Sequence, residues 1–284
     1  MGDSGHQVAI NAAQQRAYLK KRGVRLDQPC QLDILFPSII TDRDDLRHIP
    51  NDYARSSLFT ARNKSVPRKT LTREKLFCYN EYITILYTGI ELRAEDDELV
   101  WLQILHYSQT VPMGLPFKFT IKDLVRDVGW AKNGNNYRRA KNCISRLRAN
   151  EVLCLNTKAY GKSEPISLIK DYESINDENG SQMAYKMWVD LNLILLFAGN
   201  TFTSHDWELY RGLSQVARRL ADYVVSHERP FPLAIEKLKK ICDSTDLKAT
   251  SWRQTVRKAC CELEIAKIAK IANLGIDDKI LFVR

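Results

Sequence analysis

Hydrophobic and polar positions along the chain predict a series of elements whose order occurs twice. In the first series, "KLFCYN" and "YITILYTG" are typical of strands, "AEDDELVWLQILHYSQ" of a helix and "FKFT" of a short strand. Two helices follow, "TIKDLVRDVGW" capped by Thr120 and "NNYRRAKNCISRLRANE" beginning at Asn133 or Asn135. After the strand-like "VLCLNTKAYG", the runs "PISLIKDYESI" and "MAYKMWVDLN" flank an Asn-Gly pair, which predicts a hairpin.

The same order recurs nearer the end of the chain. "LSQVARRLADYVVSHERP" predicts a helix capped by Ser214, "FPLAIEKLKKICDS" a short strand and a second helix, and "KATSWRQTVRKACCELEI" a third. "KIAKIANLGIDDKILFVR" predicts a closing hairpin. Helix, short strand, helix, helix, hairpin is the order of a winged helix. We therefore predict an α+β fold with tandem winged-helix domains over residues 71–192 and 193–284, with their boundary within residues 191–203.

Residues 1–70 are predicted to form a largely extended, flexible arm. "RNKSVPRKTLTREK" is basic, polar and interrupted by proline, and the apolar face of "NAAQQRAYLKKRG" is too thin to support a core. One stretch of the arm differs, because a tight apolar cluster lies between Pro29 and Pro37. This cluster consists of Gln31, Leu32, Ile34, Leu35 and Phe36. It is too short for a core helix, and Pro37 stops it from continuing as one.

Charge and cysteine usage narrow the class of protein. The chain has 43 Lys and Arg against 34 Asp and Glu, a net charge of +9, which favours a polyanionic partner, nucleic acid before an anionic membrane surface. No apolar run is long enough to span a bilayer, and the seven cysteines form no C-x-x-C pair. A soluble protein of a reducing cytoplasm is expected.

The third helix of each series concentrates basic residues on the side opposite its apolar stripe. In the first, Tyr137, Ala140, Cys143, Ile144 and Leu147 make the stripe, and no acid occurs before Glu151. An ordinary solvated helix would mix charges of both signs, so this side is predicted to contact DNA. The predicted DNA-binding residues of this helix are Arg138, Asn142 and Arg146, with Arg139 at the edge.

In the second third-helix, Trp252, Val256, Ala259, Cys260 and Leu263 form the stripe that is expected to be buried. Arg and Gln side chains read guanine and adenine edges, and Ser and Thr bond phosphates near a helix N-terminus. The predicted DNA-binding residues here are Lys248, Thr250, Ser251, Arg253, Gln254, Arg257 and Lys258. Three-helix units with basic third helices also bind RNA or proteins, so the pattern alone leaves these alternatives open.

The candidate motifs for catalysis and metal binding lack the residues or the spacing that these functions require. "GKS" at Gly161 lacks the upstream glycine of a phosphate-binding loop, since position 156 is Asn156, and Pro165 follows where a helix should begin. "EDDE" from Glu95 fits favourable charge at a helix start better than a metal cluster, and the histidines have no metal-ligand spacing. We predict no enzymatic activity, no cofactor and no metal.

Several longer blocks resemble the TrfA-type replication initiators of broad-host-range plasmids. They are "IPNDYARSSLFTARNK", "YTGIELRAEDDELVWLQIL", "SRLRA", "ILLFAGN" and "LSQVARRLADYVVSHERPFPL". The resemblance spans roughly residue 47 to the C-terminus and weakens between residues 152 and 187. It implies a protein of the bacterial cytoplasm that binds tandem direct repeats (iterons) at a plasmid origin with two winged-helix domains. The positions matched to the family include Arg138, Arg139 and Arg146, and then Trp252, Arg253 and Gln254, of which Trp252 is assigned to the core.

The resemblance also implies partners. Such initiators open an adjacent AT-rich duplex, recruit the host replicative helicase and chromosomal initiator, and commonly shift between monomer and dimer. "QLDILF" resembles the short peptide by which bacterial proteins dock on the sliding clamp, with Gln31 at the rim of the pocket and Leu32, Ile34 and Phe36 as apolar anchors. The alternative is that the cluster folds back onto the first domain. For the whole chain, the alternative function is a tandem winged-helix repressor, which would need no clamp peptide.

Overall fold

The computed structural model describes residues 44–111, 115–158, 161–176, 182–190, 192–197, 202–245 and 248–284. The predicted clamp-binding residues Gln31, Leu32, Ile34, Leu35 and Phe36 lie outside the described residues. Within the described ranges, no helix is long and apolar enough to cross a membrane.

The first half of the described chain is built on three helices and a three-stranded antiparallel sheet. The helices are α4 (Asp97–Ser108), α5 (Ile121–Asp127) and α6 (Gly134–Arg148). The strands lie in the order β6 (Phe117–Phe119), β10 (Gln182–Trp188) and β9 (Asp171–Asn176). We call these six elements the first unit. As predicted, the Thr120 side chain caps α5, accepting a hydrogen bond from the Asp123 N–H.

A second, four-stranded sheet packs beside the first unit, and one of the strands predicted from the sequence is not part of it. Its order is β3 (Thr70–Lys75), β4 (Ile83–Ile90), β7 (Glu151–Asn156) and β8 (Gly161–Lys162). The strand predicted at "YITILYTG" is confirmed as β4, whereas "KLFCYN" lies almost entirely beyond β3. The backbone of this stretch bonds to residues 55–57 rather than to a neighbouring strand of the sheet. The Phe77 carbonyl and N–H both bond to Ser57, and the Tyr79 N–H donates to the Arg55 carbonyl.

Residues 46–60 differ from the predicted extended arm. They form β1 (Leu46–Pro50), α3 (Asn51–Ala54) and β2 (Phe59–Thr60). β2 pairs in parallel with β5 (Leu92–Arg93), and β1 pairs antiparallel with β11 (Phe202–Asp206). Ile49, Tyr53 and Phe59 are fully buried. The arm was predicted from the polar stretch that follows this segment, and the charged groups of the segment itself bond inside the protein, as where Arg47 Nε donates to Gln103.

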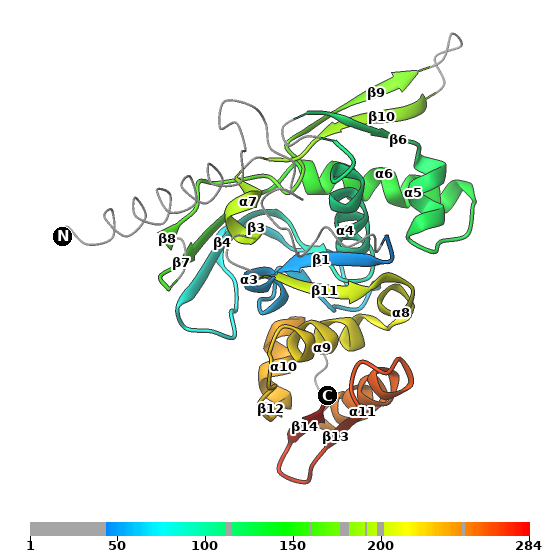
Figure 1. Cartoon of the computed structure of the whole chain (residues 1–284). Helices are drawn as coiled ribbons and strands as arrows, with labels where there is room; N and C mark the ends of the chain where they lie inside the picture. Colours follow the sequence, from blue (N-terminus) through cyan, green and yellow to red (C-terminus); the bar gives the residue numbers. More distant parts are fainter. Residues whose placement is uncertain are drawn as a thin grey trace, which may run out of the picture.

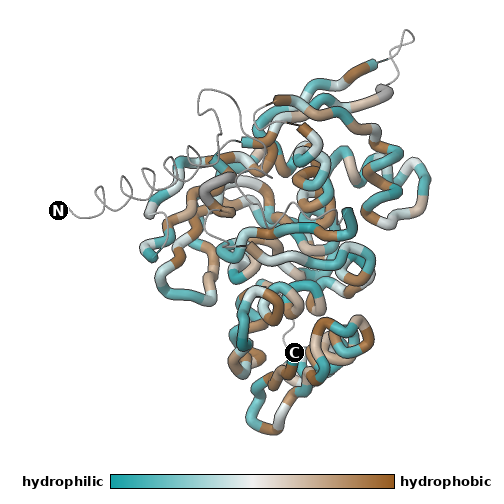
Figure 2. The backbone as a smooth tube through the Cα atoms, viewed as in Figure 1, coloured by the Kyte–Doolittle hydropathy of each residue, from teal (hydrophilic) through white to brown (hydrophobic). Residues whose placement is uncertain are grey.

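The second half repeats the order of the first unit. After α7 (Leu193–Phe197) and α8 (Trp207–Gly212) come α9 (Gln215–Val225), β12 (Leu233–Ala234), α10 (Ile235–Cys242), α11 (Ala249–Ile265), β13 (Ile271–Leu274) and β14 (Lys279–Val283). We call the elements from α9 to β14 the second unit. Its strands lie in the order β12, β14, β13. The Ser214 side chain caps α9, as predicted. Figure 2 shows hydrophobic and hydrophilic positions alternating at short intervals along the helices of both units.

A buried ionic cluster joins the two halves where α9 lies under the β1–β11 ribbon (Figure 1). Arg219 on α9 is 0% exposed, and its Nη1 lies 2.7 Å from both Glu98 Oε1 on α4 and Asp222 Oδ2. Its Nη2 donates to the carbonyls of Tyr53, Ala54 and Ser56 around α3. One guanidinium therefore bonds to three elements from both halves of the chain.

Candidate nucleic-acid interface

The sequence around α6 determines which of its sides faces outward. The Asn133 side chain caps the helix by accepting a hydrogen bond of 2.9 Å from the Asn136 N–H. Ala140, Cys143, Ile144 and Leu147 are buried, which confirms the predicted apolar stripe apart from the half-buried Tyr137. No acidic residue occurs within α6. The exposed polar residues are Asn135, Arg138, Lys141, Asn142, Ser145 and Arg148.

Two arginines predicted to contact DNA from α6 are bonded to acids within the protein. Arg146 is half-buried, and its Nη2 lies 2.7 Å from Asp97 Oδ1 and 3.3 Å from Asp96 Oδ2. Arg139 pairs with Glu95 at 3.2 Å, and its guanidinium lies 4.2 Å from the ring centroid of Trp130. Both arginines lie at the edge of the buried stripe, where acids before and in the first turn of α4 reach them. DNA contact by these two arginines stays a prediction, while Arg138 and Asn142 are exposed.

The acids that bind Arg146 form a compact ionic cluster with Arg68. Arg68 lies 2.8 Å from Asp96 and 2.6 Å from Asp97. Burial and the neighbouring Asp96 raise the pKa of Asp97 to about 6. Burial works in the same direction at Asp96, but Arg68 and Arg146 outweigh it and hold its pKa below the ordinary value. Oxygen and sulfur atoms of Asp96, Asp97 and Cys143 lie within 4.8 Å of one another, yet both carboxylates are already bonded to arginines, an arrangement typical of an ion-pair network.

The second unit presents a longer polar surface on α11. Trp252, Val256, Ala259, Cys260 and Leu263 are buried, so the predicted stripe is confirmed in full. The Trp252 indole donates to the Ile235 carbonyl at 3.1 Å, which ties α11 to α10. The predicted residues that are exposed on or just before this helix are Lys248, Thr250, Ser251, Gln254, Arg257 and Lys258. No acid occurs on α11 before Glu262.

Arg253 is oriented by the β13–β14 hairpin. Its Nε donates to Asp278 Oδ1 at 2.8 Å, and its Nη2 lies 2.5 Å from Asp278 Oδ2. These bonds raise the pKa of Arg253 and lower that of Asp278. The Arg253 guanidinium therefore makes a two-pronged contact with a side chain in the turn of the hairpin, which joins the hairpin to α11. DNA contact by Arg253 stays a prediction.

Two exposed side chains on these surfaces were missed from the sequence. Lys141 follows Arg138 by three residues on α6, and Cys261 follows Arg257 by four on α11. Helical neighbours at these spacings share a face, so the same rotation that selected Arg138 and Arg257 could have found both. The remaining basic surface of α6 therefore comprises Arg138, Lys141 and Arg148, and Arg148 lies 3.3 Å from Asp171 on β9.

Comparison with known proteins places these surfaces in a family context. A family model described as TrfA protein matches residues 2–283. The plasmid replication initiator protein TrfA of Escherichia coli is 39% identical over 268 residues, covering 94% of this chain and 69% of that protein.

Among solved structures, selenomethionine derivatives of domains 2 and 3 of RctB superpose with a TM-score of 0.52 at 10% identity, covering 75% of this chain and 85% of that one. A second structure of RctB domains 2–3 gives a TM-score of 0.48 at 13% identity, covering 80% of this chain and 85% of that one. At 10% identity the first likeness concerns the fold, and it supports the mixed arrangement of helices and sheets described above.

Proposed function

Because the chain belongs to the TrfA family, as its sequence blocks predicted, we propose that it is a plasmid replication initiator that binds directly repeated duplex sites at an origin. The named relative is a plasmid replication initiator. The observation that supports duplex binding most directly is α11, whose first three turns expose Thr250, Gln254 and Arg257 without an acidic residue among them. The chain acts in this proposal by binding, with no chemical step of its own.

We propose further that both units work as winged helices, with their third helices α6 and α11 in successive major grooves. Each unit has the order helix, strand, helix, helix, hairpin, and each hairpin pairs with the short strand that precedes the second helix. In this fold class the third helix reads base edges. We assign the larger share of base contacts to α11, because Arg139 and Arg146 of α6 are held by acids.

The base-reading roles within α11 follow from side-chain chemistry. Arg257 is suited to guanine O6 and N7, and Gln254 to adenine N6 and N7. Lys248, Thr250, Ser251 and Lys258 are suited to phosphates, which position the protein without reading sequence. On α6, Arg138 and Asn142 supply the base contacts, and Lys141 contacts a phosphate.

The remaining partners are those of an origin-binding protein. We propose that the bound chain promotes opening of the adjacent AT-rich DNA and recruits the host replicative helicase and chromosomal initiator. The peptide from Gln31 to Phe36 would bind the sliding clamp. We do not propose the repressor, because no observation favours it over the initiator.

The test of duplex recognition is equilibrium binding to a directly repeated origin duplex and to a shuffled duplex over a salt series. We expect a preference of about a thousandfold or more for the repeats, with a log–log salt slope of roughly −7 if about eight phosphates are neutralised. Gln254→Ala and Arg257→Ala should each cost about 1–3 kcal/mol on the repeats and little on the shuffled duplex.

The matched control is Arg229→Ala, an exposed arginine four residues beyond the end of α9 that carries the same charge but lies outside α11. Equal losses on repeats and shuffled duplex for Gln254→Ala and Arg257→Ala would reduce both residues to phosphate contacts. Equal wild-type affinity for the two duplexes would refute site-specific initiation.

A further inference from the structure

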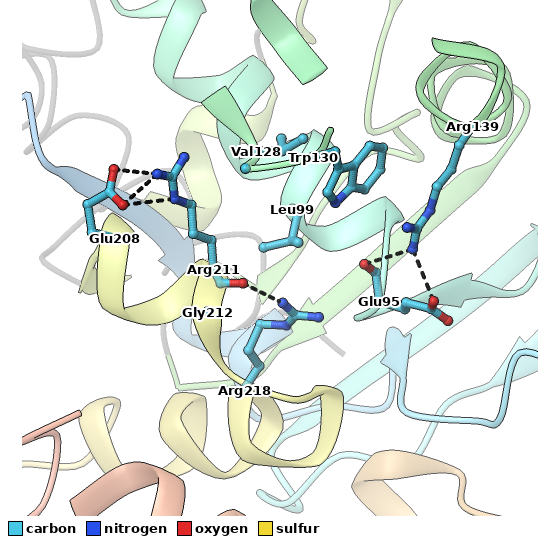
Figure 3. A pocket seen from close by; sticks show the side chains of 10 residues that line it. Glu95, Leu99, Val128, Trp130, Arg139, Glu208, Arg211, Gly212 and Arg218 are labelled. Atoms are coloured by element: carbon cyan, nitrogen blue, oxygen red, sulfur yellow. Dashed lines mark hydrogen bonds and ion pairs between the residues drawn. The ribbon is translucent and has the colours of Figure 1, made fainter. Parts of the chain in front are cut away.

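A pocket of about 400 Å³ opens between the first unit and the segment α8–α9. Glu95 and Leu99 line it from the start of α4, Trp130 from the loop after α5 and Arg139 from α6. Arg211 and Arg218 line the opposite wall. We call this cavity the arginine pocket; Figure 3 shows the Arg139, Arg211 and Arg218 guanidinium groups around it.

Arg218 is the unusual member of the arginine pocket. Its residue is 4% exposed, and its Nη1 donates to the Arg211 carbonyl at 3.3 Å. Its Nε is buried and has no hydrogen-bond partner among the described residues. The described part of the chain also supplies no ion pair to it within 4.0 Å, whereas Arg139 pairs with Glu95 and Asp96 and Arg211 pairs with Glu208. Burying a guanidinium with an unused donor and no directly bonded counter-charge is unfavourable, and a bound anion would lower that cost.

The two acids of the pocket do not fill this role. Glu208 lies 2.5 Å from Arg211 Nη2, and Glu95 bonds to Arg139 and accepts from Gln215. Glu98 and Asp222 also attract Arg218, but both are bonded directly to Arg219. Arg218 is therefore the arginine of the pocket without a direct ion pair among the described residues. In Figure 3 the Arg218 guanidinium lies beneath Leu99, between the Arg211 and Glu95 walls.

The walls of the pocket are fixed by tight local packing. Gly129 has φ +77°, and a Cβ placed there would lie 3.5 Å from the Arg211 side chain. Arg211 Nη1 donates to the Asp127 carbonyl at 2.8 Å, so α8 is bonded directly to the end of α5. Arg139 covers the Trp130 ring at 4.2 Å. The groups around Arg218 are therefore held in place before a ligand arrives, which lowers the cost of binding.

We propose that the arginine pocket binds a phosphate group, held by the buried Arg218 between the first unit and α8–α9. A phosphate oxygen suits a guanidinium that has unused donors, and Trp130 offers an aromatic wall to the rest of a phosphate ester. The group is either a phosphodiester of bound DNA or a free phosphate compound. This inference goes beyond the proposed function, because the buried Arg218 that holds the phosphate lies on neither α6 nor α11 and the binding can be tested without DNA.

The test is calorimetric titration of the full chain with inorganic phosphate in chloride buffer of matched ionic strength. We expect saturable binding that Arg218→Gln weakens by about tenfold to a hundredfold, the effect of losing a charged hydrogen bond. Arg229→Gln, the exposed arginine after α9, is the matched control and should bind as the wild type does. Glu95→Gln should strengthen binding severalfold, because it removes a negative charge from the pocket wall, and a folding defect cannot produce a gain.

Repeating the titration with saturating duplex separates the two sources of phosphate. Loss of phosphate binding in the presence of duplex would support a phosphodiester of DNA in the pocket, and retained binding would support a free phosphate compound. Absence of saturable phosphate binding by the wild type would overturn the proposal. Wild-type affinity in both Arg218→Gln and Glu95→Gln would overturn it as well. Neither result would bear on the repeat preference, which is measured through α11.

Discussion

Replacing Arg219 by methionine should destabilise the protein by about 4 kcal/mol. Removing one partner of a buried ion pair typically costs about 3–5 kcal/mol, because the other charge stays buried. Three backbone carbonyls also lose their donor, at about 1 kcal/mol each. The full sum is not expected, since Asp222 keeps the Tyr210 hydroxyl at 3.0 Å and His205 Nε2 at 2.8 Å, and Glu98, with its pKa raised to about 8, is largely protonated at pH 7.

The assay is urea unfolding at pH 7, followed by tryptophan fluorescence and by circular dichroism, with the free energy of unfolding extrapolated to water. Arg229→Met serves as control, because the same substitution at an exposed position should change that free energy by no more than about 0.5 kcal/mol. A loss below about 1 kcal/mol for Arg219→Met would refute the reasoning, since it would mean that the cluster is solvated or that the two halves do not depend on it.

Three further predictions concern single side chains. Burial and the neighbouring Asp222 raise the pKa of Glu98 from 4.5 to about 8. Between these two pH values the folded state binds a proton that the unfolded state has lost, so the free energy of unfolding should fall as the pH rises. Glu98→Gln should flatten a plot of the free energy of unfolding against pH, and an unchanged slope would contradict the assignment. Arg146→Ala should lower the free energy of unfolding by about 2 kcal/mol, because it removes one of the two arginines bonded to the buried Asp97. Arg138→Ala should change that free energy by about 0.5 kcal/mol or less yet weaken duplex binding. Both variants are measured by urea unfolding and fluorescence anisotropy, and the reverse ranking would favour Arg146 as the DNA contact. Asp278→Asn should tighten duplex binding in anisotropy titrations by removing a negative charge beside α11, and weaker binding would show that the hairpin must hold Arg253.

The helices of both units could be predicted because each carries a local signal. Thr120, Asn133 and Ser214 cap their helices, and the buried stripes of α6 and α11 follow helical spacing. Such signals lie within one turn of the element they define. The hairpin around Asn-Gly was also predicted correctly, as β9 and β10.

What the sequence concealed depends on partners far along the chain. Arg146 has the same chemistry as Arg138, and only the position of Asp96 and Asp97 on a separate helix determines that it turns inward. Likewise, residues 46–60 could not be separated from the arm by local pattern, because β1 pairs with β11, which lies far along the chain. For the candidate interface, helical rotation identified the exposed side of each helix, but it could not tell which arginines on its edges already had counter-charges.

The β1–β11 ribbon has a consequence for the order in which the chain acquires its fold. His48 and Ser204 are hydrogen-bonded across the ribbon at 2.8 Å, although 156 positions separate them in the sequence. A contact of such sequence separation forms late and slowly, since the intervening chain must first be brought together. During synthesis from the N-terminus, β1 therefore has no partner strand until β11 has left the ribosome. The first half then remains an open intermediate whose edge is completed only when translation has passed residue 206.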